Sequence, residues 1–132
     1  MYQTRGDLAQ AEASLLVHLE LYEALGCKGD VADAYGYLGL VYQTHDDLAQ
    51  AESMHKKALE LNEALGRKER MAAAYGNLGL VYQARGDLAQ AAAMYKKSIA
   101  LFQQLGGTPQ VQQVRALLDQ LAVARTKSAP GK

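Results

Sequence analysis

The feature that most constrains the fold is an internal repeat with a period of forty residues. The segment DLAQA at residues 7–11 returns at 47–51 and again at 87–91. The motif Y-G-x-L-G-L-V at residues 35–41 returns in the same way at 75–81. A period of this length is typical of arrays in which each unit buries its apolar face only against neighbouring units. We therefore expect a stack of antiparallel helix pairs.

Each unit is predicted to contain a long helix. In the middle copy Asp47 is expected at the N-cap, with Gln50 three residues later to complete a capping box. Gly66 is expected to end this helix in the left-handed conformation that glycine adopts readily. Between these ends, apolar or small residues recur at the spacing of one helical face: Leu48, Ala51, Met54, Ala58, Leu61 and Leu65.

A shorter helix is predicted before it, from about residue 30 to residue 44. Gly6 and Gly86 are expected to end the corresponding short helices of the first and third copies. In the middle copy that place is taken by Asp46, one of the few other residue types that tolerate the left-handed region. Residues 2–5 copy only the end of a short helix, so the chain is expected to open half-way through a repeat.

The residue types at the repeated positions resemble the tetratricopeptide signature. The short helix carries an aromatic residue, then Leu-Gly and Tyr, and the long helix carries Ala, an aromatic position and a small residue. The period exceeds the usual value of about 34 and the usual closing Pro is absent, which is similar to the Leu-Gly-Asn subclass and to kinesin light chains. The signature is carried by Tyr35, Leu38, Gly39, Tyr42, Ala51, His55 and Ala58, and again by Tyr75, Leu78, Gly79, Tyr82, Ala91, Tyr95 and Ser98.

This resemblance implies an all-α fold, a right-handed α-solenoid of antiparallel helix pairs (a TPR superhelix) with a C-terminal capping helix. The capping helix is expected to begin with Thr108 at the N-cap and Pro109 at the first helical position. A single array is expected over residues 1–126, made of a half repeat at 2–26, repeats at 27–66 and 67–106, and the capping helix at 108–126, followed by a disordered tail at 127–132.

The resemblance also implies a non-catalytic scaffold that binds a peptide or helix segment of another protein in a concave groove along the short helices. Asn77 stands directly before Leu-Gly, where family members often carry an Asn that bonds the ligand backbone. Chaperone-binding members carry Lys and Arg on this surface to hold a terminal carboxylate, and Gly and Ala stand there in this chain, so that ligand class is not expected. The expected groove residues are Asp33, Gly36, Tyr37, Leu40, Gln43, Thr44, Ala73, Gly76, Asn77, Leu80, Gln83 and Ala84.

Gly36 and Gly76 leave two interpretations open. Each costs a helix interior roughly 1 kcal/mol relative to Ala, so a reason for its presence is needed. One reason is a close contact between two helices. The other is a shallow groove floor that lets the backbone of a ligand come near.

An alternative function is self-assembly through the first long helix. Leu16-Val17 stand where the later copies carry Lys56-Lys57 and Lys96-Lys97, and Tyr22 replaces Asn62. An apolar helix at an end of an array usually marks an interface, which predicts a possible homodimer through Leu16, Val17 and Tyr22. The two lysine pairs are interpreted as a solvated outer face, with docking of an acidic partner as the alternative.

Other classes of function find little support. Lys plus Arg equals Asp plus Glu, so no basic excess indicates nucleic acid. Cys27 is the single cysteine, which excludes an intramolecular disulfide and fits a cytoplasmic location. No apolar run approaches the roughly eighteen residues that a membrane span requires. His45 with the two following Asp residues is too small a cluster to indicate a metal. We expect no enzyme activity, no metal and no cofactor.

Overall fold

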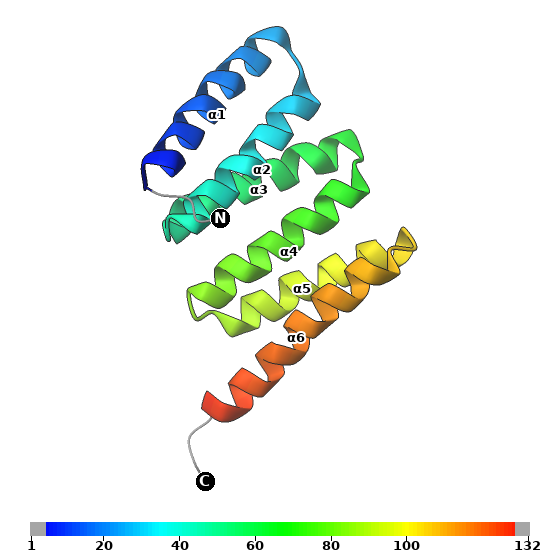
Figure 1. The fold of residues 1–132 in the computed structure, drawn as a ribbon. Coiled ribbons are helices and arrows are strands. Elements are labelled where there is room, and N and C mark those ends of the chain that lie inside the picture. The colour runs from blue at the N-terminus through cyan, green and yellow to red at the C-terminus, as the bar shows by residue number, and fades with distance from the viewer. Residues whose placement is uncertain (1–4, 129–132) are drawn as a thin grey trace. The chain divides into compact units, whose positions relative to one another are not determined.

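The computed structural model describes residues 5–128, and this part of the chain forms α-helices without any β-strand (Figure 1). It divides into two compact units, Met1–Arg67 and Lys68–Lys132. The expected helix end at residues 2–4 and the last part of the expected tail, residues 129–132, lie outside the described residues. The helices are α1 Arg5–Leu25, α2 Lys28–Thr44, α3 Leu48–Leu65, α4 Lys68–Ala84, α5 Leu88–Gln104 and α6 Thr108–Ser128.

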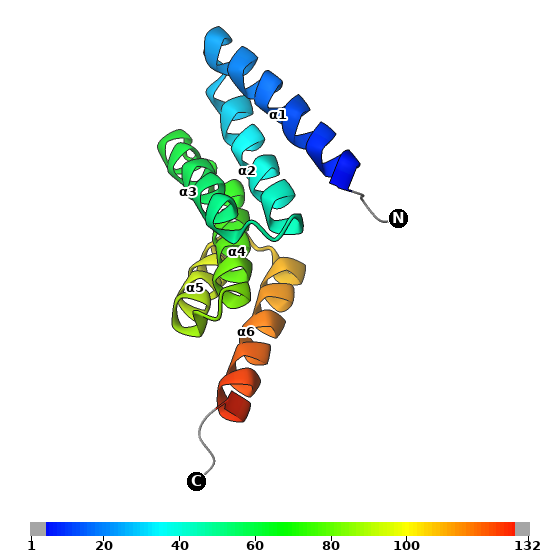
Figure 2. The same cartoon turned by 90° about the vertical axis from the view of Figure 1, so that its left-hand side faces the viewer.

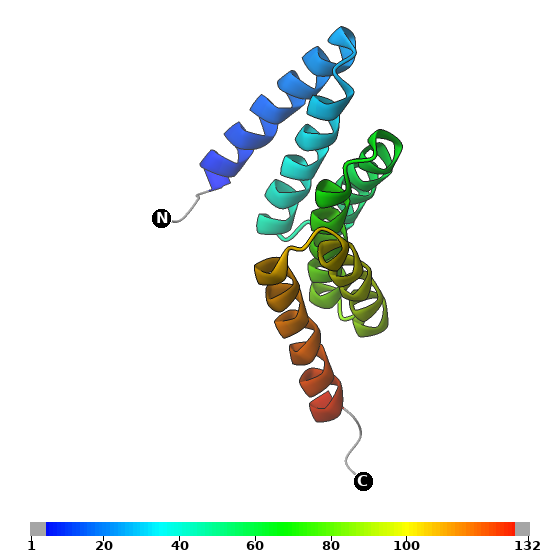
Figure 3. The same cartoon turned by 90° about the vertical axis from the view of Figure 1, so that its right-hand side faces the viewer.

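In the first unit α2 packs against both α1 and α3, and the short connections make neighbouring helices antiparallel (Figure 2). In the second unit α5 packs in the same way against α4 and α6. Figure 3 shows the same two antiparallel arrangements from the other side. The boundary between the units falls within one residue of the expected boundary between the repeats, residues 66 and 67.

Left-handed residues end the helices, as the sequence predicts. Gly66 has φ 70°, and Asp46, with φ 62°, takes the same role in the middle copy. After α3 the Arg67 N–H donates to the Asn62 carbonyl over 3.0 Å and the Gly66 N–H to the Glu63 carbonyl over 3.2 Å. These two bonds form a Schellman motif, which satisfies carbonyl groups that the end of a helix leaves free.

Three helix starts differ from the expectation. Gly6 lies inside the first turn of α1 and does not end a preceding helix. The short helix α2 begins at Lys28, two residues earlier than expected, because Cys27 occupies its N-cap. The Val111 N–H donates to the Gly107 carbonyl over 2.9 Å, so Gly107 takes the N-cap that was expected for Thr108. Pro109 is consequently the second helical residue, where a missing N–H still costs nothing.

The other ends agree with the sequence more closely. The Asp47 carboxylate accepts the Gln50 N–H over 3.3 Å, and Asp87 accepts the Gln90 N–H over 3.2 Å, as N-caps do. The capping helix α6 extends to Ser128, two residues beyond its expected end. This difference is within the usual uncertainty of a helix boundary.

The signature glycines let an aromatic side chain pack against the backbone of the short helix. A Cβ on Gly39 would lie 2.5 Å from the His55 ring, which no real contact permits. Gly79 stands in the same relation to the ring of Tyr95. Around these contacts Leu38 and Leu78 are fully buried. Leu38, Gly39 and Tyr42 of the expected inward face are therefore buried, as are their copies in the second unit, whereas Tyr35 and its copy Tyr75 are half-buried.

The extra glycines are not explained by close packing. A Cβ on Gly36 would meet nothing within 4 Å, and a Cβ on Gly76 would make an ordinary contact of 3.6 Å with the Ser98 hydroxyl. Neither helix pair therefore requires a glycine at these positions for steric reasons. The interpretation as a close helix contact fails for Gly36.

Candidate functional site

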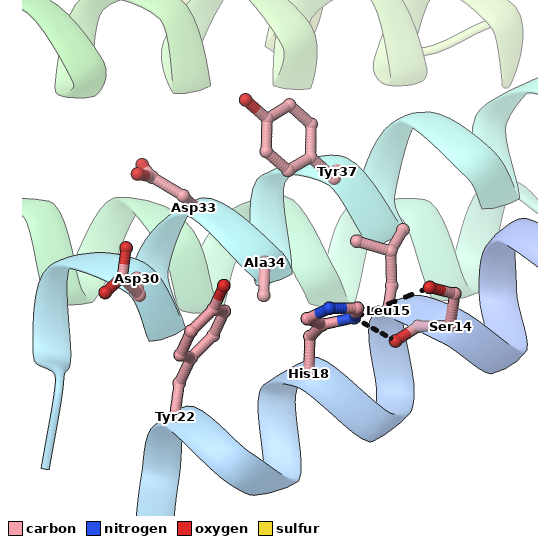
Figure 4. A pocket seen from close by; sticks show the side chains of 8 residues that line it. All are labelled: Ser14, Leu15, His18, Tyr22, Asp30, Asp33, Ala34 and Tyr37. Atoms are coloured by element: carbon pink, nitrogen blue, oxygen red, sulfur yellow. Dashed lines mark hydrogen bonds between the residues drawn. The ribbon is translucent and has the colours of Figure 1, made fainter. Parts of the chain in front are cut away.

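A groove lies between α1 and α2. Its larger hollow has a volume of about 400 Å³, and a second hollow of about 320 Å³ adjoins it. Leu15 and Tyr37 line both hollows, so we treat them as one surface, the α1–α2 groove. The larger hollow is lined by Ser14, Leu15, His18, Tyr22, Asp30, Asp33, Ala34 and Tyr37 (Figure 4), and the second by Leu15, Tyr37, Leu40, Val41 and Thr44.

Ala34 is the small residue between the two helices at this point. It is buried, and in Figure 4 its methyl group faces the rings of His18 and Tyr22 on α1. The two ring centroids are 6.0 Å apart. His18 Nδ1 lies 2.7 Å from the Ser14 carbonyl oxygen and must donate to it, so the neutral ring presents Nε2 as a hydrogen-bond acceptor. This part of the groove is thus an apolar surface edged by polar atoms.

The charge of the groove is negative at one end. Neither hollow is lined by a Lys or an Arg. Asp33 is half-buried and accepts a bond from Arg67 Nη2 over 3.2 Å, while Arg67 Nη1 donates to the Gly29 carbonyl over 3.0 Å. Asp30, one turn earlier, is exposed. A ligand entering here meets the exposed Asp30 carboxylate beside the Tyr22 ring (Figure 4).

The expected groove residues of α2 do not all face the groove. Tyr37 and Leu40 do, and they are 55% and 42% exposed. Thr44 lines the second hollow and its hydroxyl donates to the Leu40 carbonyl over 2.9 Å. The side chain of Gln43 turns to α3, where its Oε1 lies 3.1 Å from Nε2 of His55. Gly36 is half-buried and lines neither hollow.

The expected residues of α4 are placed in a similar way. Ala73 and Ala84 are exposed, whereas Gly76, Asn77 and Leu80 are half-buried. Gln83 resembles Gln43, because its Oε1 accepts the Tyr95 hydroxyl over 2.7 Å. The two glutamines therefore stabilise their own helix pairs, and the remaining positions stay candidates for partner contact.

Sequence reasoning missed the contribution of α1 to the groove. Ser14, Leu15 and His18 line it but were not expected there. Leu15 stands at the same repeat position as His55, a core residue. In the later copy this position is covered by a short helix. Within residues 5–128 the matching position on α1 has no such helix in front of it, and this difference could have identified Leu15 as a groove residue.

The residues expected for self-association separate into two groups. Leu16 and Val17 are exposed, at 45% and 63%. Leu21 and Leu25 on the same helix are also exposed, at 53% and 67%. Tyr22 instead lines the α1–α2 groove, and its ring is tilted by 40° relative to the neighbouring His18 ring.

The lysine pairs lie on exposed surface. The ammonium group of Lys57 is 5.4 Å from the centre of the Tyr35 ring, and that of Lys97 is 5.5 Å from Tyr75. Such cation–π contacts are worth about 0.5–1 kcal/mol at exposed sites. Lys56 forms an ion pair of 2.8 Å with Glu52 one turn away.

Within residues 5–128, no group of three or more His, Cys, Asp or Glu is placed to hold a metal ion. Over the same residues, no helix is long and apolar enough to span a membrane. Cys27 is a free, half-buried thiol.

Paired antiparallel helices with glycine-ended long helices, repeated at forty residues, define an all-α repeat protein. A family model described as Tetratricopeptide repeat matches residues 1–64 and again residues 66–128. The chain belongs to the tetratricopeptide repeat family, and proteins of this family generally bind other proteins.

The fold is also similar to that of a solved structure, the crystal structure of BtubC (BKLC) from P. vanneervenii. The TM-score is 0.66 at 17% identity, and the match covers 96% of this chain and 61% of that chain. This chain thus spans less than two thirds of the length of the BtubC chain, and at this identity the likeness concerns the fold alone. No curated protein matches the chain.

Proposed function

We propose that this chain is a non-catalytic scaffold that holds a peptide or helix segment of another protein in the α1–α2 groove. The observation that carries the proposal is the groove itself, two adjoining hollows of about 400 and 320 Å³ on a surface with exposed Tyr37 and Leu40. Aromatic and aliphatic side chains that are solvent-exposed and surrounded by polar rims are typical anchors of protein interfaces.

The test uses the full chain as bait and compares three forms by quantitative pull-down. Leu40→Glu places a charge in the groove, whereas Leu105→Glu makes the same change at a leucine of similar exposure, 46% against 42%, outside the hollows. We expect the wild type and Leu105→Glu to retain the same partner and Leu40→Glu to lose it. Far-UV circular dichroism of all three forms verifies that folding is intact. Equal retention by Leu40→Glu would refute the groove as the binding surface.

The second candidate function is self-association, favoured by the exposed apolar side chains of α1 outside the groove. Leu16, Val17, Leu21 and Leu25 are each at least 45% exposed. Sedimentation velocity at several concentrations should then show a dimer, and the double variant Leu16→Lys, Val17→Lys should be a soluble monomer. A wild-type chain that remains monomeric at high concentration excludes this candidate.

A further inference from the structure

The face of α1 that lines the groove corresponds to surfaces of α3 and α5 that hold a short helix. At an offset of forty residues Ala11, Leu15, His18 and Tyr22 match Ala51, His55, Ala58 and Asn62, and at eighty they match Ala91, Tyr95, Ser98 and Phe102. All eight residues of α3 and α5 are buried, whereas His18 is exposed and the other three of α1 are half-buried. We call Ala11, Leu15, His18 and Tyr22, together with the exposed Val17 and Leu21 at the edge of this surface and outside the groove, the open face of α1.

Contacts between α4 and α5 show what such a face requires of the helix that covers it. The Ser98 hydroxyl donates to the Ala72 carbonyl over 2.8 Å, so the backbone of the covering helix comes very close. Two turns further along α4, the Tyr95 ring occupies the space that a side chain at Gly79 would take. The covering helix therefore needs small residues at both positions.

The edge of the face accepts an aromatic side chain. In α5 the ammonium group of Lys97 lies 5.5 Å from the centre of the Tyr75 ring. The α1 residue at the position of Lys97 is Val17, which is 63% exposed, and Leu21 beside it is 53% exposed. An aromatic ring in the position of Tyr75 would cover both apolar side chains. Removing this apolar surface from water would stabilise the bound helix.

The charge of the groove indicates which residues are favoured in the first turn of a bound helix. A helix that covers α1 as α4 covers α5 runs antiparallel to α1, so its first turn lies at the Tyr22 end. The exposed Asp30 of α2 lies at that end (Figure 4), beside Asp33, which is paired with Arg67, and the last turn of α1 carries no basic residue. Basic side chains in the first turn would therefore be attracted to this end of the groove.

We propose that the open face of α1 and the adjoining surface of α2 seat an amphipathic helix of a partner protein. The helix presents an aromatic residue with small residues three positions earlier and four positions later, as Tyr75 does with Ala72 and Gly79, and it begins with basic residues. This inference rests on the proposed function and deepens it, because it selects a helix over an extended peptide and states its chemistry.

A synthetic helix based on α4 provides the probe. It has the sequence of residues 68–84 with Glu69→Lys, which makes its first three residues basic. Fluorescence anisotropy of the labelled peptide, titrated with the full chain, should show saturable one-to-one binding. In the peptide, Gly79→Leu fills the space needed by Leu15 and should weaken binding at least tenfold. Replacing the first three residues by Glu should also weaken it.

Two variants of the full chain locate the bound helix. Leu15→Lys charges the centre of the open face and should weaken binding at least tenfold. Leu16→Lys makes the same change one residue away, outside the open face, and should alter the Kd less than twofold. Asp30→Arg should restore affinity to the peptide with the acidic first turn. Because Leu15 is only half-buried, both lysine variants are expected to keep their helical circular dichroism.

Binding that is absent, or that Leu15→Lys leaves unchanged, overturns the inference. A wild-type dimer that Leu15→Lys dissociates also overturns it, because a second copy then occupies the face. Retention of the cellular partner in the pull-down distinguishes the proposed function, binding in the α1–α2 groove, from the proposal that a helix binds the open face of α1. Loss of that partner with Leu40→Glu but not with Leu15→Lys leaves the proposed function standing and rejects the helix seat. Retention by both variants rejects both.

Discussion

The positions of Gly39 and Gly79 have no room for a side chain, because each glycine lies against a buried ring. The His55 and Tyr95 rings fill the volume that a Cβ on Gly39 or Gly79 would need. Gly36 by contrast has open space around it and a helical backbone. Two glycines three residues apart in one helix thus have different physical reasons for being there, and only one of them is required by packing.

This difference predicts opposite effects of the same substitution. Gly79→Ala should lower the free energy of unfolding by about 1–3 kcal/mol, because the ring of Tyr95 must shift. Gly36→Ala should raise it by up to about 1 kcal/mol, because alanine favours the helix and restricts the unfolded chain. Urea denaturation measures both. Destabilisation by Gly36→Ala would show that its surroundings are tighter than the structure has them.

His55 should make the stability of the first unit sensitive to acid. Burial lowers the pKa of His55 from 6.5 to about 4, and its Nδ1 has no hydrogen-bond partner among the described residues. Below pH 6.5 the His55 ring is protonated in the unfolded chain, whereas in the folded chain it stays neutral until the pH approaches 4. The free energy of unfolding should therefore fall as the pH drops through this window, by about 3 kcal/mol in total.

The third repeat supplies the matched control for this prediction. Tyr95 occupies the position of His55 and bonds Gln83 as His55 bonds Gln43. Denaturation curves between pH 7 and pH 4 should therefore show a smaller loss of stability for His55→Tyr than for the wild type. Parallel curves for the two proteins would mean that His55 does not control the acid response.

At the scale of the helix, one face of α2 stabilises the fold and the other is available for binding. Leu38 is fully buried, whereas Leu40 is 42% exposed. Leu38→Ala should cost about 2–5 kcal/mol of stability, since it leaves a cavity in the core. Leu40→Ala should cost less than about 1 kcal/mol. Thermal and urea unfolding test the pair, and similar losses would show that the assigned orientation of α2 is wrong.

The same element shows how far sequence reasoning reaches. The forty-residue period and the glycine positions predict the helices, and the spacing of Leu38, Gly39 and Tyr42 predicts the buried face. The orientation of Gln43 could not be predicted, because a glutamine on this stripe can reach either the groove or the long helix. Its acceptance of His55 is a tertiary contact between α2 and α3 that no helical period contains.

The role of α1 was missed for a different reason. Its exposed apolar residues predict an interface, but only the packing of α1 on α2 separates Tyr22, which lines the groove, from Leu16 and Val17, which do not. Tyr42 contributes to that packing, since its hydroxyl donates to Glu12 over 2.6 Å, and this bond raises the pKa of Tyr42 to about 12. Such a link across thirty residues cannot be derived from a local pattern.

At the scale of the whole chain, helices differ in how many neighbours cover them. Within its unit α5 packs against α4 and α6, and its Tyr95 and Ile99 are buried. In the other unit α1 packs against α2 and keeps its open face. Amide hydrogens of α1 should therefore exchange about tenfold faster than those of α5, because opening exposes less apolar surface. Equal protection, measured by mass spectrometry, would indicate that α1 is covered in solution.

The central claim is that the chain binds a partner protein through the α1–α2 groove. The most direct measurement is the change in backbone amide NMR signals on adding the partner that the wild type retains and Leu40→Glu loses. We predict the largest changes at Leu15, His18, Tyr37 and Leu40, with little change at Lys56 and Lys96 on the outer surface. Changes confined to the outer lysines would contradict the account, because the partner would then bind the opposite face of the helix pairs.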